Sequence, residues 1–337
     1  MRNFKIENIG KDRFRNSKKE IGANVISVTL AEKEFEFPTV VPHQSELKKA
    51  NDTNIKLNSS LLQFVHRVDG NKRIDNDGIR DNIIDKLNSV MEENPKLLVD
   101  IFFQFWESFP PTKIEQEYIL QIQEKAGCLI ISDYETDPHQ DIIKFEERLK
   151  ELIHRFPNKI ISPTLDLSTK PPGLFEAKIA LLFKYGIKRF NVIYRSIIDE
   201  QDNWITLSRM IYGRDIWCNV VGIPQRYYSR TDKFSLIAAV FLYGVHTASL
   251  QYPRFSKKAK SKTEQDKKPR IAQQYLFNPT NGYFEEIDEM SDEESRARSI
   301  NALIKYAAKI RLKIRNQSYY SKFVPSQPSL FKILQFA

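Results

Sequence analysis

Continuous apolar runs recur along the middle of the chain and alternate with longer amphipathic stretches. Each run is short and carries few polar residues, which is typical of strands that are buried on both faces of a sheet. Eight such runs predict eight strands, at residues 37–42, 61–66, 97–105, 127–132, 159–165, 189–194, 216–223 and 247–250.

The stretches between these runs carry apolar residues at helical spacing. Helices are therefore expected at residues 75–91, 112–126, 137–156, 173–185, 201–212 and 233–243. Gly186 and Gly244 fall where two of these helices should end. Eight strands that alternate with helices predict an α/β fold, a (β/α)8 TIM-like barrel. An open doubly wound sheet is the alternative, but the chain lacks the G-x-G-x-x-G and Walker A motifs of nucleotide-binding sheets.

The ends of the chain depart from this alternation. Residues 23–29 and 33–37 read as two strands of a hairpin, which we expect at the bottom of the barrel, and residues 291–316 read as an Arg- and Lys-rich helix. The expected organisation is an N-terminal β-hairpin region at 1–36, the barrel at 37–253, a basic loop at 254–270 and a C-terminal helical extension packed on the barrel at 271–337.

Composition narrows the class of protein. Of 337 residues, 41% are hydrophobic and 12% aromatic, enough for a large core and unlike a disordered chain. No apolar run approaches the roughly 18 residues of a membrane span, and the N-terminus lacks the apolar stretch of a secretory signal, so we expect a cytoplasmic protein without membrane contact. Cys128 and Cys218 lie within apolar runs, so buried thiols are expected rather than a disulfide or a cysteine zinc site. We expect no cofactor and no metal.

The charge distribution suggests a polyanionic partner. Lys and Arg total 52 against 43 acids, a net charge of +9, and residues 254–270 hold eight bases and two acids. Such blocks favour nucleic-acid binding, while a solvated surface and an anionic membrane are alternatives. The bases expected to contact phosphates are Arg226, Arg254, Lys257, Lys258, Lys260, Lys262, Lys305, Arg311 and Arg315.

Four acids lie at or near the carboxyl ends of predicted strands, where the active site of a barrel is found. Asp100 interrupts the apolar run LLVDIFFQF, and an ionised carboxylate is costly to bury without partners. Asp133 and Glu135 follow the run CLIIS, and Asp166 follows SPTL. The structural alternatives are a paired acid inside the barrel for Asp100 and turn or cap acids for Asp133 and Asp166.

Other polar and aromatic side chains fall at the same strand ends. They are candidates to bind a substrate, with an ion pair as the alternative for the arginine and a packed histidine as the alternative for His246. These candidates are Phe103, Gln104, Tyr134, Tyr194, Arg195, Gln225 and His246. The chain contains no H-x-H, H-E-x-x-H or G-x-S-x-G motif, so neither a metal site nor a serine triad is indicated.

The order of these segments resembles the tRNA-guanine transglycosylase superfamily. The segment ISVTLAEKEFEFPTVVP is similar to the family's opening β-unit and T-P-x-F-x-P-V strand. Asp100 in VDIFFQF matches the Asp that opens D-S-G-G-F-Q, and Asp133 in IISDYETDP matches the D-E-C strand end. The segment GVHTASLQYPR is similar to G-[IV]-D-x-[FA]-D-x-x-x-P-x-R near the last strand. The resemblance covers about residues 20–255 and implies a (β/α)8 barrel that breaks N-glycosidic bonds in nucleic acid.

The departures from this pattern change the expected chemistry. The D-S-G-G glycines, the G-G-[LF] motif and the C-x-C-x-x-C…H zinc site are missing, and Ser249 stands where the family has its covalent nucleophile. Base exchange needs a covalent intermediate, whereas hydrolysis needs only a carboxylate and contacts to the leaving base. We therefore expect a DNA glycosylase with Asp100 and Asp133 as catalytic residues.

Three other functions remain open at this stage. The first is a base-exchanging transglycosylase that acts on tRNA or DNA. A non-catalytic nucleic-acid-binding barrel subunit would need the bases but not Asp100 or Asp133. An enzyme on a small phosphorylated metabolite is disfavoured because the late strands lack Gly-rich phosphate turns. DNA is preferred over RNA because the zinc module of the tRNA enzymes is absent.

Overall fold

The structure is a computed structural model of the 337-residue chain. It describes residues 4–15, 20–68, 73–105, 111–135, 137–171, 173–224, 233–251, 274–287 and 290–336. Everything below concerns these residues.

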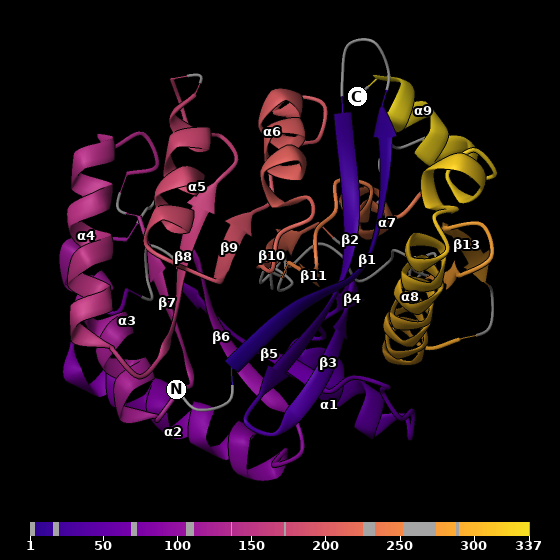
Figure 1. The fold of residues 1–337 in the computed structure, drawn as a ribbon. Helices are drawn as coiled ribbons and strands as arrows, with labels where there is room; N and C mark the ends of the chain where they lie inside the picture. Colours follow the sequence, from indigo (N-terminus) through magenta and orange to yellow (C-terminus); the bar gives the residue numbers. More distant parts are fainter. Residues whose placement is uncertain are drawn as a thin grey trace, which may run out of the picture.

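Eight parallel strands alternate with helices along the middle of the chain, and each predicted strand is present within a few residues of its expected bounds. The helices α2 to α6 surround these strands on the outside (Figure 1). In chain order the elements are β4 (Thr39–Val40), α1 (Gln44–Asp52), β5 (Leu61–Val68), α2 (Asp77–Glu93), β6 (Leu98–Phe105), α3 (Lys113–Lys125), β7 (Ile130–Tyr134), α4 (Ile142–Arg155), β8 (Ile160–Asp166), α5 (Leu174–Lys184), β9 (Arg189–Ile193), α6 (Gln201–Ile211), β10 (Trp217–Ile223), α7 (Leu236–Phe241) and β11 (Thr247–Leu250).

The predicted closed (β/α)8 barrel is wrong. Six strands form one parallel sheet in the order β4-β11-β10-β9-β8-β7, and β5 and β6 form a separate parallel pair. Between β4 and β5 the only bridge in the described chain joins His43 to Gln63, and β6 forms no ladder with β7. The sequence pattern identified the strands correctly but not how they pair.

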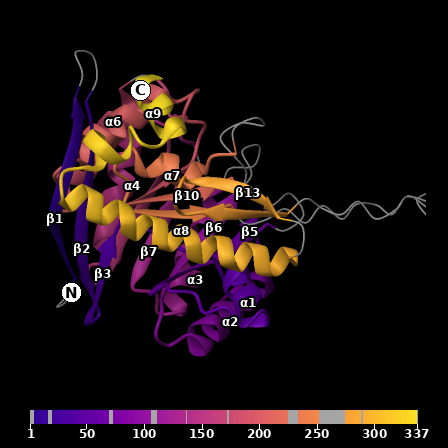
Figure 2. The same ribbon diagram turned by 90° about the vertical axis from the view of Figure 1, so that its right-hand side faces the viewer.

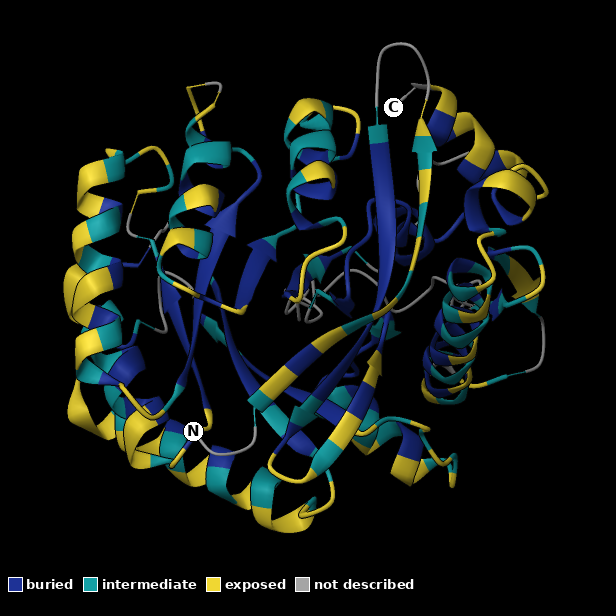
Figure 3. Ribbon diagram, viewed as in Figure 1, coloured by how far each residue is buried: buried dark blue, intermediate teal, exposed yellow. Residues whose placement is uncertain are grey.

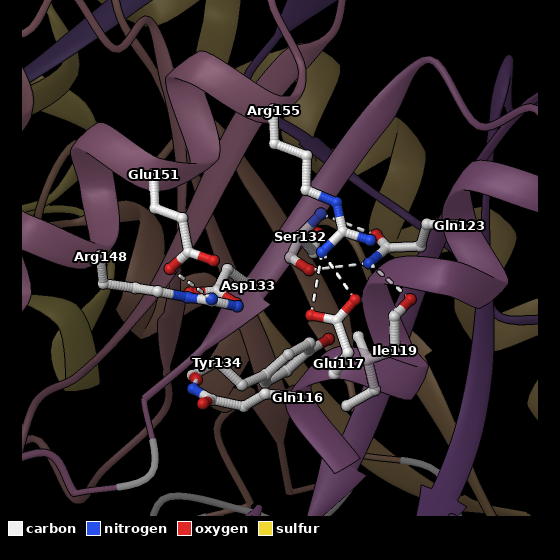
Figure 4. Close-up of polar contacts among 10 residues, drawn as sticks. All are labelled: Gln116, Glu117, Ile119, Gln123, Ser132, Asp133, Tyr134, Arg148, Glu151 and Arg155. Atoms are coloured by element: carbon white, nitrogen blue, oxygen red, sulfur yellow. Dashed lines mark hydrogen bonds and ion pairs between the residues drawn. The ribbon is translucent and has the colours of Figure 1, made fainter. Parts of the chain in front are cut away.

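Side chains of α3 explain why the sheet ends at β7. The Gln123 amide donates to the Ser132 carbonyl at 2.8 Å, and its oxygen accepts from the Ser132 N–H at 2.7 Å. Gln116 donates to the Tyr134 carbonyl (Figure 4). A sheet edge must have its backbone groups satisfied when it is buried. Glutamines on α3 thus occupy hydrogen-bonding positions on β7 that a neighbouring strand would use.

At the other break in strand pairing, between β4 and β5, a glutamine side chain also binds strand backbone groups. The Gln44 amide donates to the Val65 carbonyl at 2.7 Å, and its oxygen accepts from the Val65 N–H at 2.9 Å. A side-chain amide carries the same donor and acceptor as a peptide group, so it can substitute for one residue of a strand. Gln44 lies in the first turn of α1, which no apolar periodicity predicted.

An antiparallel sheet of β1 (Phe4–Arg15), β2 (Glu20–Leu30) and β3 (Lys33–Phe37) covers the amino ends of the parallel strands. Ile26, Val28 and Phe37 pack there against Leu98 and Trp217 in a second apolar cluster. The buried residues of β2 contrast with the alternating exposure of β1 in Figure 3. The predicted hairpin therefore caps the bottom of the fold, with a third strand, β1, that was not expected.

The last elements pack along one side of the molecule. They are the hairpin β12 (Gln274–Asn278) and β13 (Tyr283–Ile287), the long helix α8 (Asp292–Arg315), a π-helical turn (Tyr319–Phe323) and α9 (Pro328–Phe336). Helix α8 runs beside the N-terminal sheet and the β12–β13 hairpin (Figure 2). The predicted basic loop at 254–270 lies outside the described residues. None of the described helices has both the length and the apolar character to cross a bilayer.

Replacing Gln123 with Leu should destabilise the fold, because the Ser132 N–H and C=O would lose their only side-chain partner. Each unsatisfied buried backbone group costs about 1–3 kcal/mol. Urea unfolding followed by tryptophan fluorescence measures the loss. Gln121→Leu on the same helix is the control, because Gln121 only accepts one hydrogen bond from Arg80. Equal losses of stability in the two variants would contradict this account of the sheet edge.

Candidate active site

A pocket of about 620 Å³ opens at the carboxyl ends of the parallel strands. Residues from the ends of β6 to β11 and from the loops that follow them line it, the position at which parallel α/β sheets bind ligands. Its walls are Phe102, Phe103, Gln104, Phe105, Pro111, Tyr134, Glu135, Pro138, His139, Thr164, Asp166, Ser168, Ile193, Tyr194, Arg195, Ser196, Gly222, Pro224 and Gln251.

Glu135 lies directly after β7 and meets a lysine that has no exposed surface. Lys178, in the middle of α5, forms an ion pair with Glu135 and donates to the Pro138 carbonyl at 2.8 Å. Burial raises the pKa of Glu135 to about 7, and Lys178 opposes this rise. Glu135 is therefore a carboxyl group that can hold or release a proton near neutral pH.

Asp166, the last residue of β8, is the second carboxylate of the pocket. Arg195 donates two hydrogen bonds to its carboxylate, from Nε to Oδ1 at 2.8 Å and from Nη2 to Oδ2 at 2.5 Å. The backbone N–H and the hydroxyl of Ser168 each donate to Oδ1 at 2.8 Å. The negative charge of Asp166 is also one cause of the raised pKa of Glu135. Two carboxyl groups thus line one pocket, and each is paired with a cation: Asp166 accepts from four donors, and Glu135 is paired with the buried Lys178.

Aromatic rings line the side of the pocket next to β6. The Tyr134 ring meets Phe103 edge-on, with centroids 6.0 Å apart and planes at 89°, and Phe105 at 5.8 Å. The Tyr134 hydroxyl accepts a hydrogen bond from the Phe103 N–H at 2.7 Å. On the far side, Tyr194 packs against Trp204. These rings give the pocket flat apolar surfaces suited to a planar ligand.

Asp100 lies outside this pocket, contrary to its predicted catalytic role. It is the third residue of β6 and forms a buried ion pair with Arg189, the first residue of β9. Arg189 also donates to Ser162 at 2.5 Å and lies over the Trp217 ring. Burial raises the pKa of Asp100 and Arg189 opposes the rise. The structural alternative, a paired acid inside the fold, is the one the structure supports.

Asp133 also faces away from the pocket. Its side chain points toward α4, where Arg148 donates to it from Nη2 at 2.9 Å and from Nε at 3.2 Å (Figure 4). Successive residues of a strand point to opposite faces. Because Tyr134 faces the pocket, its neighbour Asp133 faces the helices. Burial raises the pKa of Asp133, and Arg148 lowers it.

The other predicted substrate-binding residues form two groups, those that line the pocket and those that do not. Phe103, Gln104, Tyr134, Glu135, Asp166, Tyr194 and Arg195 do converge on the pocket. His246 precedes β11 and is buried at the amino end, where its Nδ1 accepts from the Cys218 N–H at 3.0 Å. Ser249, the counterpart of the family's nucleophile, is also buried and is not a pocket residue. Gln225 lies outside the described residues.

Of the nine residues predicted to contact phosphates, three lie within the described part of the chain. Arg311 donates to the Pro38 carbonyl at 2.7 Å, and Arg315 pairs with Glu36 at 2.6 Å. Both therefore hold α8 against the end of the molecule opposite the pocket. Lys305 is exposed on the same helix. The remaining bases, Arg226, Arg254, Lys257, Lys258, Lys260 and Lys262, lie outside the described residues.

Lys178 is the residue of the candidate site that the sequence analysis did not identify. The signal was present, since Lys178 is the one charge in the apolar stretch AKIALLF of a predicted helix. A buried lysine needs a partner, and that partner is in the pocket. Among the described residues no group of three or more His, Cys, Asp or Glu side chains is arranged to hold a metal ion.

Two comparisons with known proteins give no match. No protein-family model matches the chain, and no curated protein matches it significantly. The function is therefore inferred from the residues of the pocket.

Removing the positive partner should move the titration of Glu135 upward. In Lys178→Gln, burial acts on the Glu135 carboxyl without the opposing charge, so its pKa should rise above about 7. Carbon-13 NMR of carboxyl-labelled glutamates measures this pKa directly. Lys184→Gln, which removes a surface partner of Glu146, should leave Glu135 unchanged. An unchanged or lower Glu135 pKa in Lys178→Gln would show that the two side chains are not coupled.

Proposed function

We propose that the protein hydrolyses N-glycosidic bonds in nucleic acid, removing a base that enters the pocket from DNA. The observation that carries this proposal is the pair of carboxyl groups at one aromatic-lined pocket: burial raises the pKa of Glu135 to about 7, and Asp166 is held by Arg195 and Ser168. A carboxyl group with a raised pKa beside a firmly hydrogen-bonded carboxylate is typical of an acid and a charge-stabilising partner. The catalytic assignment thus moves from Asp100 and Asp133 to Glu135 and Asp166.

Each carboxyl group has a distinct role in the proposed reaction. Glu135, protonated below about pH 7, donates its proton to the leaving base as the bond from the base to the sugar breaks. The carboxylate of Asp166, fixed by Arg195 and Ser168, stabilises the cationic sugar and orients the water that attacks it, and Glu135, ionised after the first step, accepts the proton that this water loses. The partly exposed aromatic side chains Phe105 and Tyr194, which line the pocket, offer stacking surfaces for the base.

The size and charge of the molecule support a nucleic-acid substrate. A pocket of about 620 Å³ has room for a flipped base and part of its sugar. Gln251 lines the pocket, and a stretch rich in Lys and Arg follows it in the sequence at residues 254–270. The net charge of +9 favours association with a polyanion.

The alternative functions differ in what the protein releases from nucleic acid. Base exchange would require a covalent nucleophile, and Ser249 is buried away from the pocket. A binding subunit would retain nucleic acid without releasing a base. Incubation with unmodified genomic DNA and with phage DNA that carries modified bases, followed by mass spectrometry of the soluble fraction, distinguishes these outcomes.

We expect base release from at least one of these DNAs, and its loss on altering either carboxyl group. Glu135→Gln removes the proton donor and should lower the rate by about 10²–10⁴-fold. Asp166→Asn removes the negative charge and should lower it by about a hundredfold or more. Glu146→Gln, a paired surface glutamate on α4, is the matched control and should retain full activity. Activity that survives both pocket substitutions would refute this assignment.

The rate of base release should also fall as the pH rises. A general acid works in its protonated form, so kcat/KM should be constant below about pH 6 and fall tenfold per pH unit above about pH 7. Glu135→Gln should remove this alkaline decline from any residual activity. A rate that rises through pH 7 would indicate that Glu135 acts as a base instead.

A further inference from the structure

Four polar side chains from neighbouring strands lie buried next to the pocket. Asn219 of β10 pairs in register with Asn191 of β9 and with Thr247 of β11. Thr164 of β8 pairs in register with Asn191 and also lines the pocket. Burying a polar group is costly unless it is hydrogen-bonded, so the hydrogen bonds of these side chains indicate their role.

These side chains form one continuous row of hydrogen bonds. The Trp217 indole N–H donates to the Thr247 hydroxyl at 2.7 Å, and that hydroxyl donates to the Asn219 side-chain oxygen at 2.8 Å. The Asn219 amide donates to the Asn191 oxygen at 2.9 Å. The Asn191 amide then donates to the Thr164 hydroxyl oxygen at 3.4 Å. We call these five side chains the polar row.

The direction of the polar row is fixed at its Trp217 end. An indole N–H can only donate, so the Thr247 oxygen accepts from it. The Thr247 side chain is fully buried, and its hydroxyl hydrogen finds an acceptor in the Asn219 oxygen. This contact sets which way the Asn219 amide is turned, and Asn219 in turn orients Asn191. Each member therefore presents a donor to the next member toward β8.

The polar row ends at a hydroxyl that lines the pocket. The Thr164 oxygen accepts from Asn191, and none of the described residues accepts from the Thr164 hydroxyl. The Asn191 amide also donates to Ser132 at 3.2 Å, but Ser132 does not line the pocket. Thr164 does, and it shares a face of β8 with Asp166, two residues later. Of the two hydroxyls, only that of Thr164 can therefore donate to a ligand in the pocket.

The depth of Thr164 matches it to the base of a bound nucleotide. A strand rises about 3.3 Å per residue, so the Thr164 Cα lies roughly 6–7 Å farther into the fold than the Asp166 Cα. Thr164 is only 3% exposed and is reached from within the pocket. Because Asp166 is assigned to the sugar, the group that reaches Thr164 is the far edge of the base.

We propose that Thr164 donates a hydrogen bond to the base in the pocket and that the polar row orients its hydroxyl for this contact. The inference rests on the proposed function, because it takes the pocket ligand to be a flipped nucleotide. The acceptor is a carbonyl oxygen or an unprotonated ring nitrogen at the edge of the base. Thr164 is then a specificity residue, since a base without an acceptor there leaves a buried donor unpaired. The other members of the polar row are positioning residues.

The first test compares duplexes with and without a base at the target position. Two labelled duplexes carry uracil or hypoxanthine, which have carbonyl acceptors, on a 2′-fluoroarabino sugar that resists cleavage, and a third carries tetrahydrofuran, which has no base. Fluorescence anisotropy gives the base preference, the ratio of the affinity for the better-bound base duplex to that for the tetrahydrofuran duplex. Thr164→Val should lower this preference about tenfold without changing the affinity for tetrahydrofuran. Thr164→Ser keeps the hydroxyl and should retain the preference.

The second test alters the polar row at Thr247, which does not line the pocket. Thr247→Val removes the hydroxyl that orients Asn219, so the base preference should fall, by a smaller factor than in Thr164→Val. Thr247→Ser keeps the hydroxyl and should behave like the unaltered protein. Ser249→Ala is the matched control, because it removes a buried hydroxyl of the same strand that has no hydrogen-bond partner in the described chain. An unchanged base preference in Thr247→Val overturns the role of the polar row.

The outcomes separate this inference from the proposed function. An equal base preference in the unaltered protein and in Thr164→Val overturns the inference, even if base release is confirmed. A loss of affinity in Thr164→Val that extends to the tetrahydrofuran duplex also overturns it, because the role of Thr164 would then be structural. A preference that is lost in Thr164→Val and retained in Thr164→Ser supports the inference even if no base is released, in which case the proposed hydrolysis fails alone.

Discussion

The buried edge of β7 is the constraint on which the rest of the site depends. Its backbone groups need partners, and Gln123 and Gln116 of α3 provide them where a closed barrel would have a strand. The substitution ties α3 directly to β7 and leaves β6 in a separate pair with β5. Residues of both β6 and β7 line the pocket, and Glu135 follows β7 directly.

Paired charges then define what the pocket can do. The buried Lys178 holds Glu135 at the pocket without keeping it fully ionised, because burial raises the pKa of that carboxyl to about 7. Arg195 fixes Asp166 from the next strand. Deeper in the fold, the pair of Asp100 with Arg189 balances two buried charges far from solvent. Similar ion pairs thus occur both in the interior of the fold and at the pocket.

The sequence predicted the strands well because strands buried on both faces are continuous apolar runs. Closure of the sheet was not predictable in this way, since it depends on which group pairs with β7, and a glutamine on a helix gives no periodic signal. The site was partly predictable. Asp133 lies on the face of β7 that carries its partner Arg148, and nothing in the sequence identifies that arginine on the next helix as the partner. His246 was placed at the wrong end because the short strand β11 begins only after it.

The most direct test of the central claim is the affinity for a mimic of the cationic sugar. A duplex that carries a positively charged pyrrolidine in place of one sugar is compared with the same duplex carrying neutral tetrahydrofuran. If Asp166 stabilises a developing cation, the charged duplex should bind at least about a hundredfold more tightly, and Asp166→Asn should remove most of this preference. Equal affinities for the two duplexes in the unaltered protein would contradict the proposed chemistry.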